Sequence, residues 1–285
     1  MRIGAHVSTA GGLDKAIDRA KELGAEAIQC FCSSPQGWAF KPVPPGQAKS
    51  FSEKARAADV QPVFLHGIYL VNLGAESQEN LTKGIDSLVN YTTAASAMGA
   101  QGVIFHPGSH KGVGYEGVFR QTVASLKEVL ARSPRDVWLI IENSAGMGSH
   151  IGSKFEEIGR ILRALEDPRL KVCLDTQHLF AAGHPVADRP GLEKTMQEFD
   201  RAVGLASLVA VHANDSKVPF ASGVDRHENI GQGAIGLAGF EVILAHPAFR
   251  HVPFLLEVPG FDNKGPDRAN VDILKAVRAK VGVGA

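Results

Sequence analysis

Six residues that can bind a metal recur along the chain at nearly even intervals. The intervals between them are 40, 36, 33, 37 and 45 residues. Each residue directly follows a short apolar run, as in IFHPG and CLDTQ. The six are His66, His106, Glu142, Asp175, His212 and Glu257, and His178, Asp225 and His227 bring the candidate ligands to nine.

The residue types indicate which ions and which reaction such a set would serve. Histidine nitrogens combined with carboxylate oxygens, without thiolate, suit zinc, manganese or iron. Open sites use three or four ligands each, so nine ligands imply two or three ions. Such a cluster activates water near neutral pH and stabilises the attacking and leaving oxygens of a displacement at phosphorus. Taken singly, Asp175 would more simply cap a helix, but the joint pattern favours a metal centre.

The elements that must position these residues alternate along the chain. Short runs rich in Val, Ile, Leu and Phe predict buried strands, and the longer amphipathic runs between them predict helices. We expect strands at 2–6, 27–31, 62–65, 102–105, 137–141, 171–174, 208–211 and 253–256, and helices at 13–23, 81–98, 115–131, 154–165, 192–203, 237–245 and 267–281. Eight repeats in 285 residues favour an α/β fold, a single eight-stranded parallel β/α (TIM) barrel over residues 1–285.

In such a barrel the carboxyl ends of all strands meet at one rim, where catalytic residues lie. The candidate ligands should therefore converge there. His6 ends the first strand without an obvious partner, so we expect it to support the ligands or simply to pack. The segment 33–49, rich in Pro and Ser, predicts a long loop at this rim. Its Trp38 and Phe40 either bind a ligand or pack over the barrel mouth.

The overall composition excludes few partners. Lys plus Arg and Asp plus Glu both number 30, so the net charge is zero and any nucleic-acid site must be locally positive. Cys30, Cys32 and Cys173 have no paired spacing and predict buried free thiols rather than a disulfide framework. The chain opens without a signal peptide and holds no run of about 20 apolar residues, so we expect a cytoplasmic protein without membrane contact.

Longer motifs run through nearly the whole chain. They include GAHVSTAGGL, HGIYLVNLG, FHPGSHKG, ENSAGMGSHIG, CLDTQHLFAAG, HANDSK, DRHENIGQGAIG and LLEVPG. With these motifs the sequence closely resembles the endonuclease IV family of apurinic/apyrimidinic DNA-repair enzymes. The resemblance implies a barrel with three zinc ions that cuts double-stranded DNA on the 5′ side of abasic sites. The cut implied by the resemblance leaves a 3′-hydroxyl and a 5′ deoxyribose phosphate. We also expect the protein to be a monomer.

The resemblance also implies a division of the nine ligands. Glu142 would bridge two zinc ions and orient the attacking water, which makes it the catalytic residue. His66 and His106 would complete the first site, and Asp175, His212 and Glu257 the second. The third ion would be held by His178, Asp225 and His227. Spacing alone would instead pair Asp175 with His178 on one ion.

The same resemblance implies side chains that enter the DNA around the abasic gap. Tyr69 and Leu70 match two of them. The third is commonly Arg, and here Gln36 or Gly37 stands at that place. Gly67 is a second departure, because Asp is usual there. Lys111 and Arg226, with Lys217 and Lys264, are expected at the same rim, either as phosphate contacts or as ordinary surface charge.

Two other functions fit parts of this pattern. A sugar isomerase or epimerase on a related metal barrel also uses strand-end Glu, Asp and His, but it needs only one or two ions. It has no use for a separate site made of His178, Asp225 and His227. A non-catalytic binder of damaged DNA would be expected to lack a ligand, and no ligand is missing from this sequence.

Overall fold

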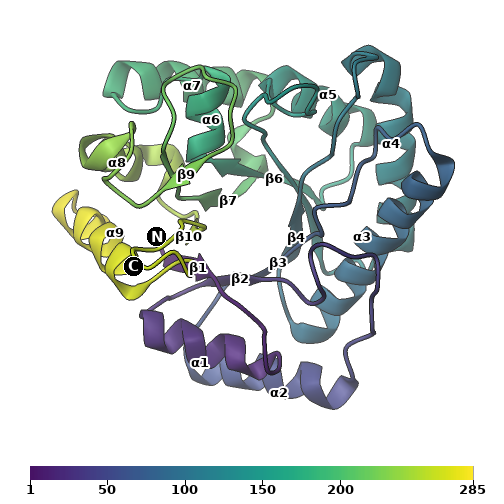
Figure 1. The fold of residues 1–285 in the computed structure, drawn as a ribbon, viewed down its shortest axis with the longest axis horizontal. Coiled ribbons are helices and arrows are strands. Elements are labelled where there is room, and N and C mark those ends of the chain that lie inside the picture. Colours follow the sequence, from purple (N-terminus) through teal and green to yellow (C-terminus); the bar gives the residue numbers. More distant parts are fainter. Residues whose placement is uncertain (285) are drawn as a thin grey trace.

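The structure, a computed structural model, describes residues 1–284, so Ala285, the last residue of the expected domain, lies outside the described residues. Within residues 1–284, eight strands close into a barrel in the order β1-β10-β7-β6-β5-β4-β3-β2, with every neighbouring pair parallel (Figure 1). The barrel strands are β1 (Ile3–His6), β2 (Ile28–Cys30), β3 (Val63–His66), β4 (Gly102–Phe105), β5 (Trp138–Glu142), β6 (Leu170–Asp175), β7 (Leu208–His212) and β10 (Phe254–Leu256). The expected barrel is confirmed.

Helices surround the barrel and cover the outer face of the strands (Figure 1). They are α1 (Asp14–Leu23), α2 (Pro45–Ala57), α3 (Gln78–Met98), α4 (Tyr115–Arg132), α5 (Phe155–Leu165), α6 (Thr176–Ala182), α7 (Arg189–Ala202), α8 (Gly236–Ala245) and α9 (Arg268–Lys280). Two short 3₁₀ helices, η1 (Leu205–Ser207) and η2 (Pro247–Phe249), precede β7 and β10. The seven expected helices are present with bounds shifted by a few residues.

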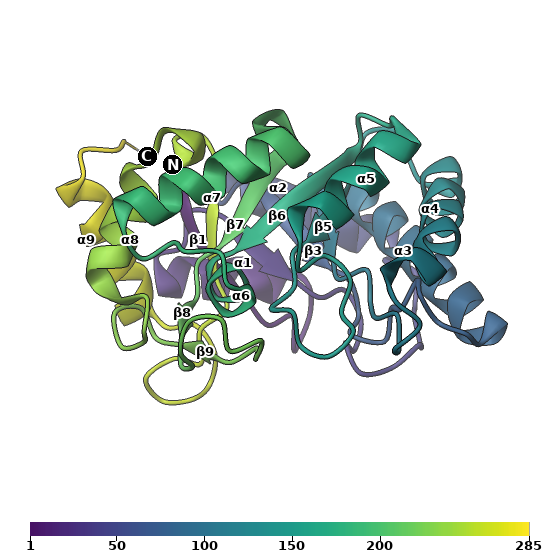
Figure 2. The ribbon, with the colours of Figure 1, turned by 90° about the horizontal axis from the view of Figure 1, so that it is seen from above.

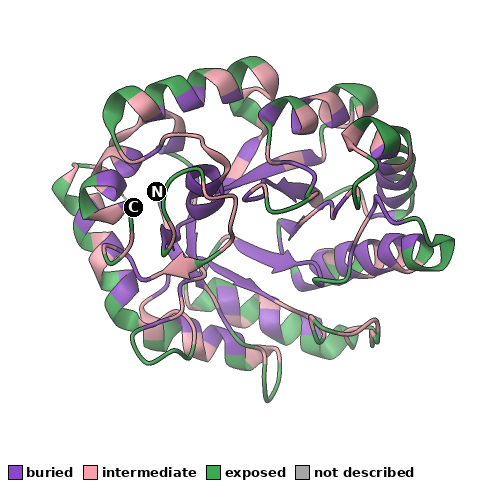
Figure 3. Ribbon diagram, turned by 45° about the horizontal axis from the view of Figure 1, so that its top comes forward, coloured by how far each residue is buried: buried purple, intermediate pink, exposed green. Residues whose placement is uncertain are grey.

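The core has two layers, because successive side chains of a strand point to opposite faces. Outward-facing residues such as Leu65, Val103 and Ile141 join the apolar layer between strands and helices. Figure 3 shows the barrel strands buried along most of their length, with exposed residues confined to the helices and the loops. Inward-facing residues form a second cluster inside the barrel: Ala27, Phe64, Ile104, Ile140, Cys173, Ala210 and Leu255.

The segment 33–49 is a loop only as far as Pro44, because helix α2 begins at Pro45. The sequence pattern missed this helix. Its buried face is Ala48, Phe51 and Ala55, so a single large apolar residue carries the periodicity. Trp38 and Phe40 are half-buried and pack against the core, and the Phe40 ring lies 6.0 Å from that of Tyr91. The packing interpretation of these two aromatic residues therefore describes the structure better than the exposed binding loop.

Two further elements depart from expectation, and both lie beside the strand-end residues. Helix α6 follows β6 directly and was not predicted, since it is only seven residues long. The long connection after β7 contains a small antiparallel hairpin, in which β8 (Asp215–Ser216) pairs with β9 (His227–Glu228). The hairpin fixes His227 in an ordered strand rather than leaving it in a loose loop.

The loops at the carboxyl ends of the strands gather on one face, and both chain ends lie toward the opposite face (Figure 2). The amino group of Met1 donates a hydrogen bond to the carbonyl oxygen of Gly284, at 2.7 Å. Among residues 1–284, no helix combines the length and apolar character needed to cross a membrane. Cys30 and Cys173 are buried free thiols as expected, whereas Cys32 is only half-buried.

Candidate metal centre

The strand register aims the candidate ligands into the barrel mouth. Phe64, Ile104 and Ile140 point into the barrel interior. Side chains two residues apart on a strand point the same way, so His66, His106 and Glu142 also face inward, one layer nearer the rim. The same step leads from Cys173 to Asp175, from Ala210 to His212 and from Leu255 to Glu257. Six elements far apart in sequence therefore contribute to one layer.

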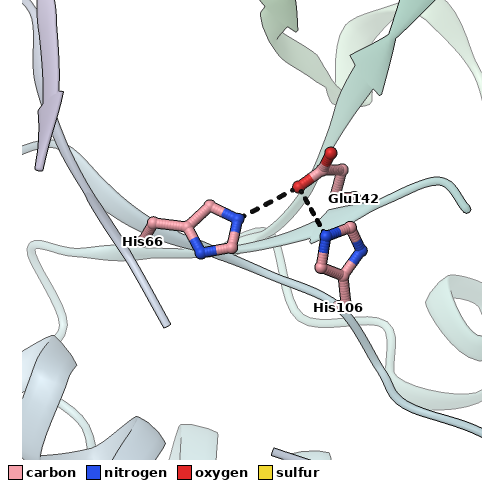
Figure 4. A group of neighbouring side chains, drawn as sticks. All are labelled: His66, His106 and Glu142. Carbon is pink, nitrogen blue, oxygen red and sulfur yellow. Dashed lines mark hydrogen bonds and ion pairs between the residues drawn. The ribbon is translucent and has the colours of Figure 1, made fainter. Parts of the chain in front are cut away.

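The first group consists of His66, His106 and Glu142, shown in Figure 4. The Nε2 atoms of His66 and His106 lie 3.2 and 3.3 Å from the same oxygen of Glu142, Oε2. Glu142 is fully buried, and His66 is 3% exposed. Two imidazole nitrogens and one carboxylate oxygen that converge in this way form three sides of a metal site with a position open to the cleft.

The second group contains Glu142, Asp175, His212 and Glu257. His212 Nδ1 lies 3.0 Å from Glu142 Oε1 and 3.3 Å from Glu257 Oε2. Glu142 thus presents one oxygen to the first group and the other to the second. This is the arrangement that a bridging carboxylate requires.

The third group forms where α6 and β9 meet. His178 Nε2 and His227 Nε2 both lie 3.3 Å from the carboxylate of Asp225. Asp175 belongs to this group as well, because its ligand atom and those of His178 and His227 all lie within 4.8 Å of one another. Its Oδ2 atom is 3.6 Å from His227 Nε2 and 3.9 Å from His212 Nδ1. Asp175 therefore lies between the second and third groups, close both to His178, the partner suggested by spacing, and to the ligands implied by the resemblance.

Hydrogen bonds fix the orientation of four of the five histidines. His66 Nδ1–H donates to the carbonyl oxygen of Gly67, and His178 Nδ1–H to that of Asn143. His227 Nδ1–H donates to the carbonyl oxygen of Glu257, and His212 has Gln29 Oε1 at 2.8 Å from Nε2. In each ring the other nitrogen faces the carboxylates, and in the neutral ring that nitrogen carries a lone pair. Metal-binding histidines are held in this manner.

Two buried atoms show that the donor set fits a cation. Nε2 of His178 and Nε2 of His227 are buried and have no hydrogen-bond partner, although carboxylate oxygens lie nearby. A buried polar atom without a partner is costly. A cation bound between the two nitrogens and Asp225 would satisfy both atoms at once.

The ionisation of the site residues also favours a bound cation. Burial alone would raise the pKa of Glu142, but the imidazoles of His106 and His212 outweigh it and hold that pKa well below its usual value. Burial opposes ionisation of Asp225 too, yet His178 brings the pKa of Asp225 to about 2. Burial lowers the pKa of His106 to about 4, which keeps this imidazole neutral and able to bind a metal. Protons and cations therefore compete for one set of atoms.

Amide side chains complete the layer, and their residue types did not mark them in the sequence as part of a metal site. Asn214 Nδ2 donates to Asp175 Oδ2 at 2.7 Å, and Asn214 Oδ1 accepts the backbone N–H of Glu257 at 2.8 Å. Gln29 donates to Glu257 Oε1 at 2.6 Å. The two-residue step from the interior Ala27 to Gln29 is the signal that would have identified it. Asp175 also accepts the N–H of His178 at 2.9 Å, so its capping role is real.

A cleft of about 720 Å³ opens over the metal groups and includes Tyr69 and Arg226 in its wall. Tyr69 is 63% exposed and Leu70 38% exposed, which is unusual for large apolar side chains. The backbone N–H of Tyr69 donates to the carbonyl oxygen of Pro35, at 3.0 Å. This bond joins the loop that carries Gln36, which is exposed, and Gly37 to the loop that carries Tyr69.

The basic candidates lie around the same face, and Lys111, Lys217, Arg226 and Lys264 are all exposed. The Gly67 departure has a steric explanation. Gly67 is buried, and a Cβ atom there would lie 3.0 Å from Cβ of Phe105, so an Asp would require a shift of its neighbour. His66 Nδ1 contacts the backbone carbonyl oxygen of Gly67, so this hydrogen bond does not depend on which side chain stands at position 67.

The chain is similar in sequence and in structure to known proteins. The Xylose isomerase-like TIM barrel family matches residues 17–277. The probable endonuclease 4 of Halothermothrix orenii is 37% identical over 276 residues, which cover 96% of this chain and 99% of that protein. The crystal structure of endonuclease IV from Thermus thermophilus has a TM-score of 0.87 and 34% identity, covering 98% of this chain and 100% of that one. The chain belongs to the endonuclease IV family.

Other relatives extend this result. The probable endonuclease 4 of Solibacter usitatus is 39% identical over 281 residues and covers 97% of each chain. A D-tagatose 3-epimerase-like protein reaches a TM-score of 0.73 at 16% identity, over 99% of this chain and 100% of that chain. At that identity the epimerase shares the fold alone. Membership of the endonuclease IV family thus confirms the resemblance carried by the sequence motifs.

Proposed function

We propose that this protein is a zinc-dependent phosphodiesterase of DNA repair that hydrolyses double-stranded DNA on the 5′ side of abasic sites. The products would be a 3′-hydroxyl and a 5′ deoxyribose phosphate. The observation that carries the proposal is the convergence of eight candidate ligands into three adjoining groups beneath one cleft, with the ninth, Asp225, 3.3 Å from His178 and His227. The names of the endonuclease relatives support a nuclease.

Each group would hold one zinc ion. His66, His106 and Glu142 would bind the first, and Glu142 with Asp175, His212 and Glu257 the second. His178, Asp225 and His227 would bind the third, with Asp175 close by. When bound, the ions supply an activated water near neutral pH and positive charge at the attacking and leaving oxygens.

The protein residues position the reacting groups. Glu142 presents its two oxygens to two different groups, so it would hold the attacking water between them in line with phosphorus. Asp225, the more exposed of the carboxylates at 45% of its side chain, lies at the mouth of the cleft. The third group is therefore on the side from which the phosphate and its leaving oxygen would arrive.

The exposed residues around the cleft suit a duplex with a missing base. An abasic site has lost stacking, so extruding it costs less than extruding a paired base. Tyr69 and Leu70 would fill the gap and stabilise a kink, with Gln36 or Gly37 at the third place. Lys111 and Arg226 would contact phosphates. The bound ions supply positive charge that the neutral chain as a whole lacks.

One experiment tests the proposed function directly. We expect the purified protein to cut a duplex that carries a single abasic site, and to stop cutting when a strong chelator removes the metals. Metal analysis of the same preparation should give about three zinc ions per chain. One or two manganese or magnesium ions would favour a sugar isomerase instead. A zinc-loaded protein that binds abasic duplex and never cuts it would contradict the proposal.

The role of the exposed apolar side chains can be tested separately. We expect Tyr69→Ala and Leu70→Ala to weaken binding to abasic duplex by about 1–3 kcal/mol each, as for other side chains that stack on bases. Tyr69→Ala should leave the thermal stability nearly unchanged, because Tyr69 is 63% exposed, and Leu70→Ala should lower it no more than Leu205→Ala does, because both leucines are 38% exposed. Leu205→Ala is the matched control, since Leu205 is also 38% exposed but precedes the amino end of β7, away from the cleft. Equal affinities for all three variants and the parent would exclude the insertion role.

A further inference from the structure

Strands β1 and β2 contribute no candidate metal ligand. Gln29, in β2, nevertheless lies beside the ligands of the second group. Gln29 is fully buried and lies two residues beyond Ala27, which faces the barrel interior. Its amide nitrogen lies 2.6 Å from Glu257 Oε1 and 2.9 Å from His6 Nδ1, and its amide oxygen lies 2.8 Å from His212 Nε2. One side chain thus contacts two candidate ligands and the end of β1.

The hydrogen-bonding types determine how this amide must be oriented. A carboxylate can only accept, so the atom that lies 2.6 Å from Glu257 must be the nitrogen of the amide. The other atom is then the oxygen, which can only accept a hydrogen from His212. The Gln29 oxygen therefore requires a proton on His212 Nε2.

This requirement determines what the opposite side of the His212 ring can do. With the proton on Nε2, neutral His212 presents a lone pair at Nδ1, and Nδ1 lies 3.0 Å from Glu142 Oε1 and 3.3 Å from Glu257 Oε2. A lone pair directed at two carboxylate oxygens is favourable only with a cation between them. Gln29 thus leaves His212 Nδ1 available to a metal and holds Glu257 in place at the same time.

We infer that Gln29 is a positioning residue for the second metal site, which selects the metal-binding tautomer of His212 and fixes the carboxylate of Glu257. The inference rests on the proposed metal centre. Gln29 is an uncharged amide, a residue type that is not itself a usual ligand of zinc. His6 is the neighbour that accepts the second amide hydrogen, which gives the end of β1 its supporting role.

The test measures zinc affinity in the full-length protein. Gln29→Met keeps the length of the side chain and removes all three of its hydrogen bonds, so we expect one of the zinc ions to bind about 10–100-fold more weakly, as for other supporting residues of metal sites. Affinity is measured by competition with a chelator of known strength. The matched control is Gln121→Met, because Gln121 is half-buried and donates to the carbonyl oxygens of Leu73 and Ala75 rather than to any candidate ligand. The control should bind all its zinc as the parent does.

A second measurement needs no variant. In zinc-loaded parent protein with ¹⁵N-labelled histidine, we expect His212 to carry its proton on Nε2 and to bind zinc through Nδ1. A proton on Nδ1, or unchanged zinc affinity in a folded Gln29→Met protein, would overturn the inference. A parent protein that binds no zinc at all would instead contradict the proposed function, so the two failures are distinguishable.

Discussion

Glu142→Gln is expected to abolish cutting of abasic duplex while leaving DNA binding nearly unchanged. The change removes a negative charge and replaces one of the two oxygens by an amide nitrogen. Because Oε1 and Oε2 face different metal groups, both groups lose the carboxylate that joins them. Loss of one preorganised electrostatic contact costs about 10²–10³-fold in rate, so we expect a loss of at least that size.

Single-turnover cleavage and a binding assay on the same abasic duplex separate the two effects. Glu26→Gln is a suitable control, since Glu26 is half-buried and pairs with Arg278 at 2.6 Å near the amino end of β1. This control should lose some stability and keep its cleavage rate, because its carboxylate is remote from the cleft. Equal losses of binding and cutting in Glu142→Gln would count against a catalytic role.

Removal of the metals is expected to lower the stability of the folded protein as well as its activity. An ion present at about 1,000 times its dissociation constant stabilises the native state by about 4 kcal/mol. A change of 1 kcal/mol shifts the melting temperature by about 2–4 °C in domains of 150–250 residues. We therefore expect chelation to lower the melting temperature of this larger chain by roughly 8 °C or more.

The metal-free barrel should nevertheless remain folded. Burial alone would lower the pKa of His178, but Asp175 and Asp225 outweigh it and raise that pKa well above its usual value. Protonated imidazole then replaces part of the missing positive charge. Melting curves with chelator, and again after zinc is restored, check this prediction. Glu142→Gln should respond less to the chelator than the parent, and an identical melting temperature with and without metal in the parent would contradict a bound cluster.

Much of the site followed from the sequence because strand ends carry positional information. His106, Glu142 and His212 each follow an apolar run of a parallel strand, and parallel strands of a barrel end at one rim. Their meeting could therefore be predicted without any distance. Helix α2 could not be predicted in this way, because its buried face contains two alanines and one large apolar residue, Phe51. This pattern is too weak to distinguish the helix from the preceding loop.

The grouping of the ligands was not accessible to the sequence in the same way. Asp175 lies 3.6 Å from His227 Nε2 and 3.9 Å from His212 Nδ1, so its place between two groups depends on how α6, β7 and β9 pack. Sequence spacing suggests one partner for it and resemblance suggests another. Only the positions of α6, β7 and β9 show that Asp175 lies close to the second and the third metal groups alike.

The sequence by itself determined the barrel, the rim and the identities of the nine candidate ligands, because periodicity and residue type are local properties of the chain. The tertiary structure decided which ligands face one another, and it revealed Gln29 and Asn214 among them. The reason is physical. An amide has no charge to mark it as part of a metal site, and its role appears only when folding brings its donor to Glu257 and its acceptor to His212.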